Sequence, residues 1–386
     1  MSESTIFTDK SKLSPRYVPE ELPHRQAQIQ QIVHVFSDAP KDPDKFPLTV
    51  LQVIGAAGIG KTSTVIRSSK IVEELFENNR LTLTTAYINL KLQGGNKFAV
   101  YRFLLQHIAP ELPAQGLSAE DMLRYMLQYL RQNGQYALIV LDEIDYLIKS
   151  SKDTGIIYDL TRLNEFEPEK PCNVKGVIFI ARSTEFYGKL DAAELSTLGR
   201  VPMEFHPYTI QEVSDILEAR ASQAFKPKAL GSDVIDKVAT ITTSADVNGD
   251  VRYALDLLLY AGNLAEVQGT GRVILDHIRK VHSQIHPSLT SEEIEQLSKK
   301  HLVSLLALIR ALKSKKKPYV ELKDVRLYAS ELAQQMGLKE VEIEDYLEDL
   351  RERKLIDIKS LKAIGLHGAS IAELQPILMR KLEGEK

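Results

Sequence analysis

The segment G-A-A-G-I-G-K-T at residues 55–62 constrains this chain more than any other feature of its sequence. It follows the apolar, β-branched run P-L-T-V-L-Q-V-I that ends at Ile54, and a helical pattern begins at about residue 60. A strand, a glycine-rich turn and a helix in this order fit the pattern G-x-x-x-x-G-K-[ST], whose backbone N–H groups cradle phosphates. The segment therefore predicts a phosphate-binding loop in an α/β domain.

The residue types in this loop explain how it would hold phosphates. Glycine tolerates the positive φ angles of a tight turn, so Gly58 and Gly60 allow the backbone N–H groups to point inward. Lys61 supplies a full charge to the β- and γ-phosphates, and Thr62 offers a hydroxyl to Mg²⁺. The flanking strand and helix argue against a chance match. We expect ATP or ADP with Mg²⁺, bound by Gly58, Ile59, Gly60, Lys61, Thr62 and Ser63.

A second buried strand predicts the acidic half of the same site. The segment L-I-V-L-D-E-I-D at 138–145 places Asp142 at the carboxyl end of apolar residues, where open α/β sheets present ligand groups. We expect Asp142 to hold Mg²⁺ together with Thr62, and Glu143 to act as the general base for an attacking water. Asp145 is expected to be a cap or a surface charge. The reaction indicated is transfer of the γ-phosphoryl group to water.

Strand and helix patterns alternate through the first half of the chain and then give way to helices alone. Strands are expected up to Ile54 and at 82–90, 136–141 and 174–181. This alternation predicts a mostly parallel sheet covered on both faces. After Pro207 only helical patterns follow, as far as residue 286. The expected division is an N-terminal arm at 1–22, an α/β domain at 23–209, a helical domain at 210–290 and a C-terminal domain at 296–386.

Composition limits the classes of partner and compartment. The 386 residues carry 49 Lys and Arg against 52 Asp and Glu, which excludes a coat of positive charge over the whole surface. From residue 296 onward, however, 18 basic residues face 14 acidic ones. A single cysteine, Cys172, excludes an internal disulfide framework. Without an apolar run of the ~20 residues that a membrane span needs, we expect a cytoplasmic protein with no membrane partner.

The C-terminal domain has the element order of a winged helix-turn-helix. Three helical patterns are followed by a strand and a glycine turn, at 300–313, 322–336, 342–354 and 355–359. Candidate phosphate contacts are Lys315, Lys316 and Lys317 after the first helix, and Lys359 and Lys362 near the wing. The competing explanation for the lysine run is that lysines at a helix C-terminus favour the dipole and stay solvated.

The chain as a whole resembles the archaeal Orc/Cdc-type replication initiators, a family of AAA+ ATPases. The carriers of this resemblance are Y-V-P-E-E-L-P-H-R at 17–25, F-H-P-Y at 205–208, D-I-L-E-A-R at 215–220 and N-G-D-V-R-Y-A-L-D-L-L at 248–258. The fold implied is a P-loop AAA+ parallel sheet domain with a helical lid and a C-terminal winged-helix domain. The nucleotide contacts implied are Tyr17, Val18, Pro19 and Arg25 near the adenine, Tyr208 and Arg220 at the lid, and Arg252 facing the γ-phosphate.

Two departures from the family pattern bear on hydrolysis. The family usually has an asparagine after the strand that matches 174–181, whereas this chain reads I-A-R-S-T-E-F. Either Arg182 or Ser183 could take that water-orienting place, and we favour Ser183. Arg200 is the nearby candidate for an arginine that acts in trans, although an ordinary surface arginine is at least as consistent. These departures favour a slow ATPase that serves as a binding switch.

One feature opposes DNA binding by the expected recognition helix. It carries acidic residues mostly on its exposed side, and carboxylates repel phosphates. These residues are Glu342, Glu344, Asp345, Glu348 and Asp349. DNA could then be held by the wing, by the lysine run and by a helical insert near 155–170, with Arg162 and Lys170, that resembles the family's additional DNA-contacting motif.

The resemblance implies an ATP-controlled initiator that binds double-stranded origin DNA and helps recruit the replicative minichromosome-maintenance helicase, with paralogous initiators as further partners. The alternative is a signalling-type AAA+ ATPase whose winged helix docks a protein. A third hypothesis, a clamp-loader-like motor, predicts rapid turnover, whereas an initiator should hold its nucleotide and turn over slowly.

Overall fold

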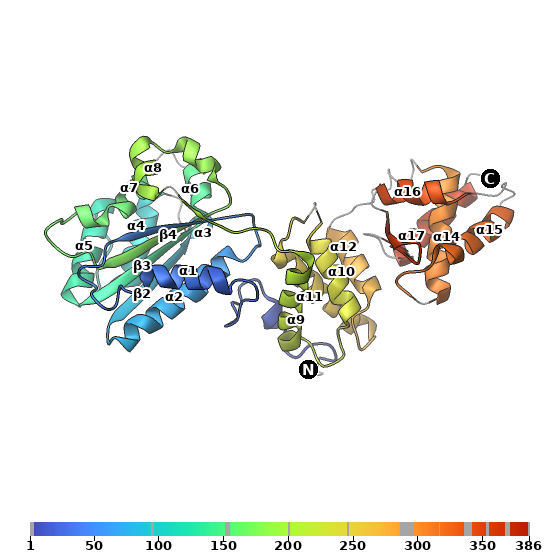
Figure 1. Cartoon of the computed structure of the whole chain (residues 1–386), viewed down its shortest axis with the longest axis horizontal. Helices are drawn as coiled ribbons and strands as arrows, with labels where there is room; N and C mark the ends of the chain where they lie inside the picture. The colour runs from blue at the N-terminus through green and yellow to red at the C-terminus, as the bar shows by residue number, and fades with distance from the viewer. Residues whose placement is uncertain are drawn as a thin grey trace. The chain divides into compact units, whose positions relative to one another are not determined.

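The computed structural model describes residues 4–93, 96–150, 155–199, 201–244, 247–285, 297–315, 317–335, 342–352, 355–366 and 371–384 of the chain (Figure 1). Two compact units make up the chain. The first unit combines Pro15–Ile216 with Thr242–Arg252. The second combines Met1–Ser14 with Leu217–Ile241 and Tyr253–Lys386. The polypeptide therefore passes between the units more than once.

A five-stranded sheet forms the centre of the first unit. Its strands lie in the order β2 (Thr82–Asn89), β3 (Gln135–Asp142), β4 (Val174–Ala181), β1 (Thr49–Ile54) and β5 (Met203–Glu204). All neighbouring strands are parallel, which confirms the predicted sheet. Ile54 lies opposite Ala181 and Asp142 lies opposite Ile180, so the carboxyl ends of β1, β3 and β4 meet at one edge.

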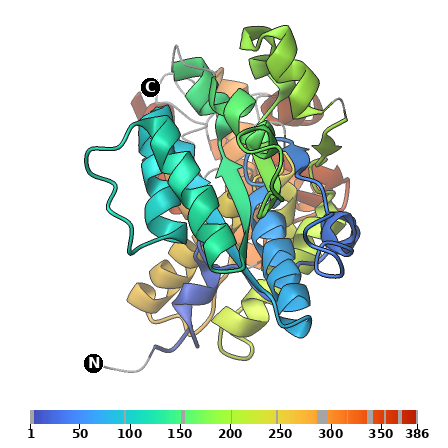
Figure 2. The same cartoon turned by 90° about the vertical axis from the view of Figure 1, so that its left-hand side faces the viewer.

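Helices cover both faces of the sheet, because parallel strands rich in apolar residues need burial on each side (Figure 2). These are α4 (Lys97–Ile108) and α5 (Ala119–Gln132) on one face, and α1 (Gln26–Phe36) and α2 (Lys61–Asn78) on the other. Ile139 and Val177 share a core with α4 and α5, whereas Gly176 faces α1. A Cβ on Gly176 would lie 2.5 Å from the Phe36 ring, so this glycine permits the close approach of α1.

Side-chain caps fix where several helices begin. Asn96 accepts a hydrogen bond from the Ala99 backbone N–H at the start of α4, and Ser118 accepts one from Asp121 at the start of α5. The shorter helices of this unit are α3 (Leu90–Gln93), α6 (Ile144–Ser150), α7 (Gly155–Thr161) and α8 (Ala192–Leu198), with 3₁₀ turns η2 (Leu163–Glu165) and η3 (Thr184–Lys189).

Between the sheet and Ile285, the described residues form four helices, as the sequence predicts. They are α9 (Ile210–Ala224), α10 (Ser232–Thr242), α11 (Val251–Gln268) and α12 (Leu275–Ile285). Apolar residues at helical spacing bury one side of each, for example Val238 in α10, Leu258 in α11 and Ile278 in α12. The first turns of α9 and α11 belong to the first unit, and the rest of both helices belongs to the second.

The N-terminal segment packs on these helices, although the sequence predicted only an arm there. Ile6, Phe7 and Leu13 are buried, and Leu13 ends the 3₁₀ turn η1 (Lys10–Leu13). Phe7 forms an isolated antiparallel bridge with Phe225, and the two ring centroids are 4.9 Å apart. A Cβ on Gly262 of α11 would lie 2.2 Å from the Phe7 ring, so the glycine leaves space for this aromatic side chain.

The C-terminal domain has the winged-helix arrangement that the sequence predicts. Its elements are α14 (Lys299–Lys315), α15 (Leu322–Gln335), α16 (Glu344–Glu352), β6 (Ile356–Ser360), β7 (Ala363–Leu366) and α17 (Ile371–Gly384). β6 and β7 form an antiparallel hairpin in which Ile356 lies opposite Leu366. α14 is buried along most of its length and supplies much of the domain's own hydrophobic core.

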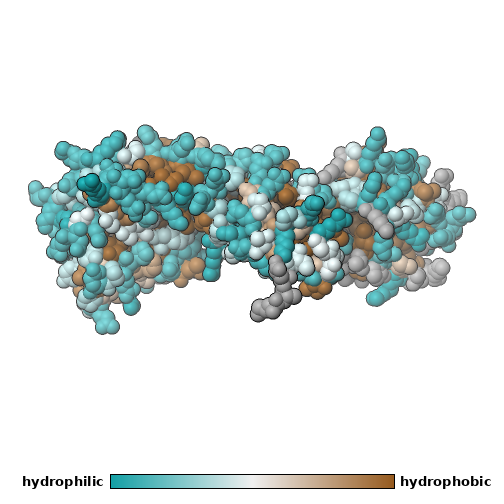
Figure 3. Space-filling view, turned by 90° about the horizontal axis from the view of Figure 1, so that it is seen from below, coloured by the Kyte–Doolittle hydropathy of each residue, from teal (hydrophilic) through white to brown (hydrophobic). Residues whose placement is uncertain are grey.

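Hydrophilic residues dominate the molecular surface in the view of Figure 3, and a brown hydrophobic patch stands out at the left, on the part that contains the five-stranded sheet. Among the described residues, no helix combines the length and the apolar character that crossing a membrane requires.

Candidate nucleotide-binding site

The loop between β1 and α2 has the conformation of a phosphate cradle. Gly58 and Gly60 adopt φ angles of 72° and 89°, in the left-handed region that favours glycine. A Cβ on Gly58 would lie 1.8 Å from Oδ1 of Asp250, and one on Gly60 would lie 2.6 Å from the Tyr208 hydroxyl. Both glycines are therefore required by backbone conformation and by close neighbours.

Lys61 lies at the first turn of α2 and is 8% exposed. Its ammonium donates hydrogen bonds to the carbonyl oxygens of Gly55 (2.6 Å) and Ala56 (2.7 Å). Burial lowers the pKa of Lys61 to about 8, and the neighbouring carboxylates of Asp142 and Glu143 oppose that shift. The cation is thus held inside the loop, at the place where an anionic phosphate would meet it.

Asp142 and Thr62, the two residues expected to hold Mg²⁺, are in contact. The Thr62 hydroxyl donates to Oδ2 of Asp142 at 2.8 Å, and Asp142 is 5% exposed. A hydroxyl and a carboxylate oxygen are hard donors of the kind that Mg²⁺ prefers, alongside waters and substrate phosphates. The described residues contain no cluster of three or more His, Cys, Asp or Glu side chains that could hold a metal alone. This donor set fits Mg²⁺ that is bound together with a nucleotide.

Tyr87 is a site residue that the sequence analysis missed. Its hydroxyl donates to the same Oδ2 of Asp142 at 2.8 Å, from the neighbouring strand β2. Burial is the largest cause that raises the Tyr87 pKa, followed by the Asp142 charge, so the phenol stays protonated and remains a donor. Only the pairing of β2 with β3 could have pointed to this residue, because no motif contains it.

Glu143 and Arg182 form a two-point ion pair. Arg182 Nε donates to Oε2 of Glu143 at 3.0 Å, and Nη2 donates to Oε1 at 3.1 Å. Ser183, which the sequence analysis favoured for the water-orienting role, caps η3 by accepting a hydrogen bond from the Glu185 backbone N–H. Arg182 lines one cleft with Ala57, Lys61, Thr62, Asp142, Glu143, Ile180, Ala181 and Arg252.

Arg252 reaches this cleft from the first turn of α11. Its backbone N–H donates to Oδ1 of Asp250 at 2.9 Å, and the Val251 backbone N–H donates to the Gly58 carbonyl oxygen at 3.2 Å. The start of α11 is thereby tied to the phosphate loop. Asp250, Val251 and Arg252 belong to the same compact unit as the sheet, so this geometry is internal to that unit.

Arg25 and Tyr208 lie directly behind the loop. The Arg25 guanidinium donates to the Ile59 carbonyl oxygen at 2.8 Å and stacks 3.8 Å from the centre of the Tyr208 ring. Burial lowers the pKa of Arg25 and raises that of Tyr208 to about 12. The other residues expected near the adenine, Tyr17, Val18 and Pro19, are half-buried in the same unit.

Arg220 is a buried residue of the second unit. Its Nη2 donates to the Ser14 carbonyl oxygen at 3.4 Å, which ties α9 to the N-terminal segment. The structure therefore brings together the predicted residues of the loop, of β3 and of the start of α11. Arg220 makes this hydrogen bond with Ser14, within the second unit.

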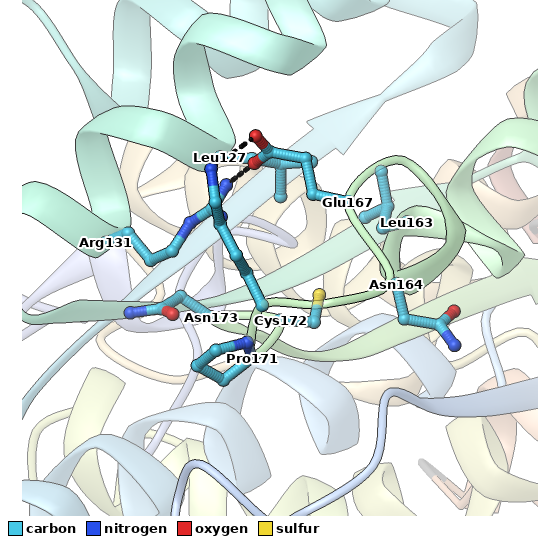
Figure 4. A pocket seen from close by; sticks show the side chains of 9 residues that line it. Leu127, Arg131, Leu163, Asn164, Glu167, Pro171, Cys172 and Asn173 are labelled. Carbon is cyan, nitrogen blue, oxygen red and sulfur yellow. Dashed lines mark hydrogen bonds and ion pairs between the residues drawn. The ribbon is translucent and has the colours of Figure 1, made fainter.

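A second depression lies next to the amino end of β4, away from the carboxyl edge of the sheet (Figure 4). Arg131 and Glu167 form an ion pair across it, and Cys172 lies below them. Burial raises the pKa of the Cys172 thiol, which keeps it protonated and unreactive.

The candidate DNA contacts of the C-terminal domain are only partly described. Lys317 and Lys362 are exposed, and Lys315 is paired with Asp324 at 3.1 Å. The described residues do not include Lys316 or the side chain of Lys359. They also do not include Arg200, the candidate for an arginine that acts in trans.

The acidic side of α16 is neutralised in part by pairing inside the domain. Glu344 pairs with Arg326 of α15, and Glu348 pairs with Arg351 at 2.8 Å. Asp349 accepts from His301 at 2.7 Å. Glu342 and Asp345 stay exposed. The helix presents fewer free carboxylates than its sequence suggests.

Comparison with known families defines the class of protein. Residues 48–190 match a model described as an AAA domain, and residues 214–283 match the Cdc6 AAA+ ATPase-type lid domain. The fold and the site thus define a nucleotide-binding AAA+ protein with a Cdc6-type lid.

Curated relatives and solved structures narrow this class. The ORC1-type DNA replication protein 1 of Sulfurisphaera tokodaii is 31% identical over 341 residues, which cover 88% of this chain and 82% of the relative. The ORC1-type DNA replication protein of Pyrococcus furiosus is 31% identical over 308 residues, which cover 79% of this chain and 71% of the relative. This chain belongs to the family of ORC1-type DNA replication proteins.

Two solved structures resemble the whole chain. Cdc6p from Pyrobaculum aerophilum has the same fold, with a TM-score of 0.84 at 24% identity, and the match covers 98% of this chain and 99% of that one. The Aeropyrum pernix ORC1 protein, solved in complex with DNA, gives a TM-score of 0.65 at 25% identity, with full coverage of both chains.

Proposed function

We propose that this protein is a DNA replication initiator that binds ATP in the cleft at the carboxyl edge of its sheet and binds origin DNA through its C-terminal domain. The observation that carries the proposal is the cleft itself, which joins Lys61, Thr62, Asp142 and Arg252 around one phosphate loop, with the pair of Glu143 and Arg182 at its rim. Membership of the family of ORC1-type replication proteins supports the assignment to initiation.

The nucleotide would be held by charge and by backbone donors. Lys61 and Arg252 would contact the phosphates, and the loop of Gly58, Ile59 and Gly60 would donate its N–H groups to them. Mg²⁺ would be held by Thr62 and Asp142, and it supplies positive charge that offsets the charge on the phosphates. Stacked Arg25 and Tyr208 stiffen the loop from behind.

Hydrolysis would use Glu143 as the base. The carboxylate takes a proton from a water whose oxygen bonds to the γ-phosphorus. The bond between that phosphorus and the β–γ bridging oxygen breaks, and ADP and phosphate leave. The pairing of Glu143 with Arg182 supports slow turnover, because it turns the carboxylate toward the guanidinium.

DNA binding by the C-terminal domain is supported by its winged-helix arrangement and by its excess of basic over acidic residues. The A. pernix relative was solved in complex with DNA. Lys317 and Lys362 are the described exposed candidates for phosphate contacts, and Lys315, Lys316 and Lys359 extend the set.

Recruitment of the replicative minichromosome-maintenance helicase and pairing with paralogous initiators follow as proposals from the family, together with a place at the nucleoid in the cytoplasm. A protein-docking role for the winged helix is the second candidate, and the exposed Glu342 and Asp345 favour it. Capture of a protein partner that survives nuclease treatment would support docking.

The deciding test is binding of duplex DNA at several salt concentrations, with and without ATP. We expect an origin fragment to bind more tightly than random DNA of equal length, with an affinity that falls as salt rises. Equal binding of both fragments at moderate salt would contradict the proposal.

A further inference from the structure

The two-point contact between Arg182 and Glu143 is built as a restraint on the glutamate. Each carboxylate oxygen accepts one guanidinium N–H, at 3.0 and 3.1 Å. A planar guanidinium matches a carboxylate in this fork geometry, which is stronger and more directional than a single contact. The Glu143 side chain is 18% exposed and that of Arg182 is 48% exposed. The pair therefore lies at the rim of the cleft, with the glutamate on the inner side.

The backbone at Glu143 shows that this position is constrained. Its φ angle is 61°, in the left-handed region that is unfavourable for a residue with a side chain. Asp142 Oδ1 accepts a hydrogen bond from the Glu143 backbone N–H at 2.9 Å. Strand β3 and this turn fix the Glu143 backbone. Arg182, directly after β4, holds the Glu143 carboxylate.

Water activation requires a carboxylate oxygen that points toward the water. A base must lie within hydrogen-bond reach of the water whose proton it takes, with a lone pair available to accept that proton. In the Arg182 contact, one lone pair of each oxygen is engaged, and the side chain is turned toward the guanidinium. The rate then depends on the fraction of time in which Glu143 is released from Arg182.

We propose that Arg182 is a positioning residue that holds Glu143 in a resting conformation and thereby slows ATP hydrolysis. This inference rests on the proposed function of the cleft as an ATPase site. It assigns the slow turnover of the switch to one ion pair. It also gives Arg182 a role that depends on the glutamate, instead of one in binding the nucleotide.

Single-turnover hydrolysis of ATP by the full chain tests the proposal. Arg182→Ala is expected to raise the rate about two- to fivefold, as the loss of a partly exposed ion pair allows. ATP affinity, measured with a fluorescent analogue, is expected to stay within about twofold, since Lys61 and Arg252 remain. Lys149→Ala removes the exposed Lys149–Glu185 pair of the same unit and should leave the rate unchanged.

A second variant shows whether the gain passes through the glutamate. Arg182→Ala combined with Glu143→Ala should be as slow as Glu143→Ala alone. A lower rate in Arg182→Ala, or an unchanged one, would overturn the proposal. If the unaltered protein fails to bind the ATP analogue while its fold is intact, the proposed function of the cleft fails first, so the two failures are distinguishable.

A readout that does not use activity is the nitrogen-15 NMR signal of the Arg182 Nε–H group, identified as the signal missing in Arg182→Lys. The contact at 3.0 Å should shield this proton from exchange at neutral pH in the protein without nucleotide. Glu143→Ala is expected to abolish the shielding, whereas Glu185→Ala is not. Equal exchange in the unaltered protein and in Glu143→Ala would contradict the pairing.

Discussion

The nucleotide cleft and the C-terminal domain hold their charged residues in opposite ways. In the cleft, Lys61 and Asp142 are nearly inaccessible, and each is fixed by hydrogen bonds of 2.6–2.8 Å. In the C-terminal domain, Lys317 and Lys362 are exposed, and Glu344, Glu348 and Asp349 of α16 are paired on its surface. Buried charges are specified by their neighbours, whereas exposed ones contribute through long-range attraction that salt screens.

The largest expected loss of ATP affinity is at Lys61. Lys61→Ala removes the buried cation that faces the phosphates, and we expect ATP affinity to fall roughly 100-fold or more, as for a desolvated charge partner. Titration with a fluorescent ATP analogue measures this. Lys317→Ala removes an exposed lysine and should leave nucleotide affinity unchanged. Tight ADP binding by Lys61→Ala would remove the contrast between the two regions.

Gly58 offers the next largest effect, with a matched control in the same unit. A Cβ on Gly58 would lie 1.8 Å from Asp250 Oδ1 at a φ of 72°, whereas Gly116, at a φ of 79°, has open space around it. Gly116→Ala should lower the free energy of unfolding by about 1 kcal/mol, through backbone strain alone. Gly58→Ala should lower the free energy of unfolding by about 3 kcal/mol or more and weaken nucleotide binding at least tenfold.

Thermal unfolding and nucleotide titration of both glycine variants check this prediction. Equal unfolding midpoints and equal affinities would show that the contact with Asp250 does not constrain the loop.

Exposed lysines should act weakly and through salt. Lys317→Ala combined with Lys362→Ala should lower DNA affinity about tenfold at low salt, and each lost phosphate contact should reduce the salt slope by about one. Fluorescence anisotropy with origin DNA at four salt concentrations measures both quantities. Lys45→Ala, an exposed lysine of the first unit, is the control and should change neither.

The smallest effect is expected at Tyr87. Tyr87→Phe removes one hydrogen bond to Asp142 and keeps the aromatic packing, so affinity for Mg²⁺-ATP should fall about fivefold, which corresponds to the ~1 kcal/mol of one typical hydrogen bond. Affinity for ADP in EDTA should not change. Calorimetry under the two conditions separates these effects, and an equal loss in both would show that Tyr87 does not act through Asp142.

The contiguous parts of the site were predictable because a motif fixes them locally. A strand, a turn and a helix place Gly58, Gly60, Lys61 and Thr62 within a few residues of one another, and the register of β1, β3 and β4 brings Asp142 to the same edge. The strands predicted to end at Ile54 and to cover 174–181 are those observed.

The contacts of Arg182 and Ser183 could not be predicted from the sequence. Adjacent residues at a strand end point in different directions, and the structure turns Arg182 toward Glu143 and leaves Ser183 to cap η3. Tyr87 and the N-terminal segment were beyond prediction for a related reason. Their partners, Asp142 for Tyr87 and Phe225 for Phe7, are distant in the chain.

The sequence by itself determined the parallel sheet, the phosphate loop, the acidic residues after β3 and the order of the domains, because periodicity and short motifs act over neighbouring residues. The tertiary structure alone decided which side chains contact Glu143 and Asp142, and which carboxylates of α16 are paired. Those contacts depend on strand pairing and helix packing between segments far apart in the chain, where the sequence carries no local signal.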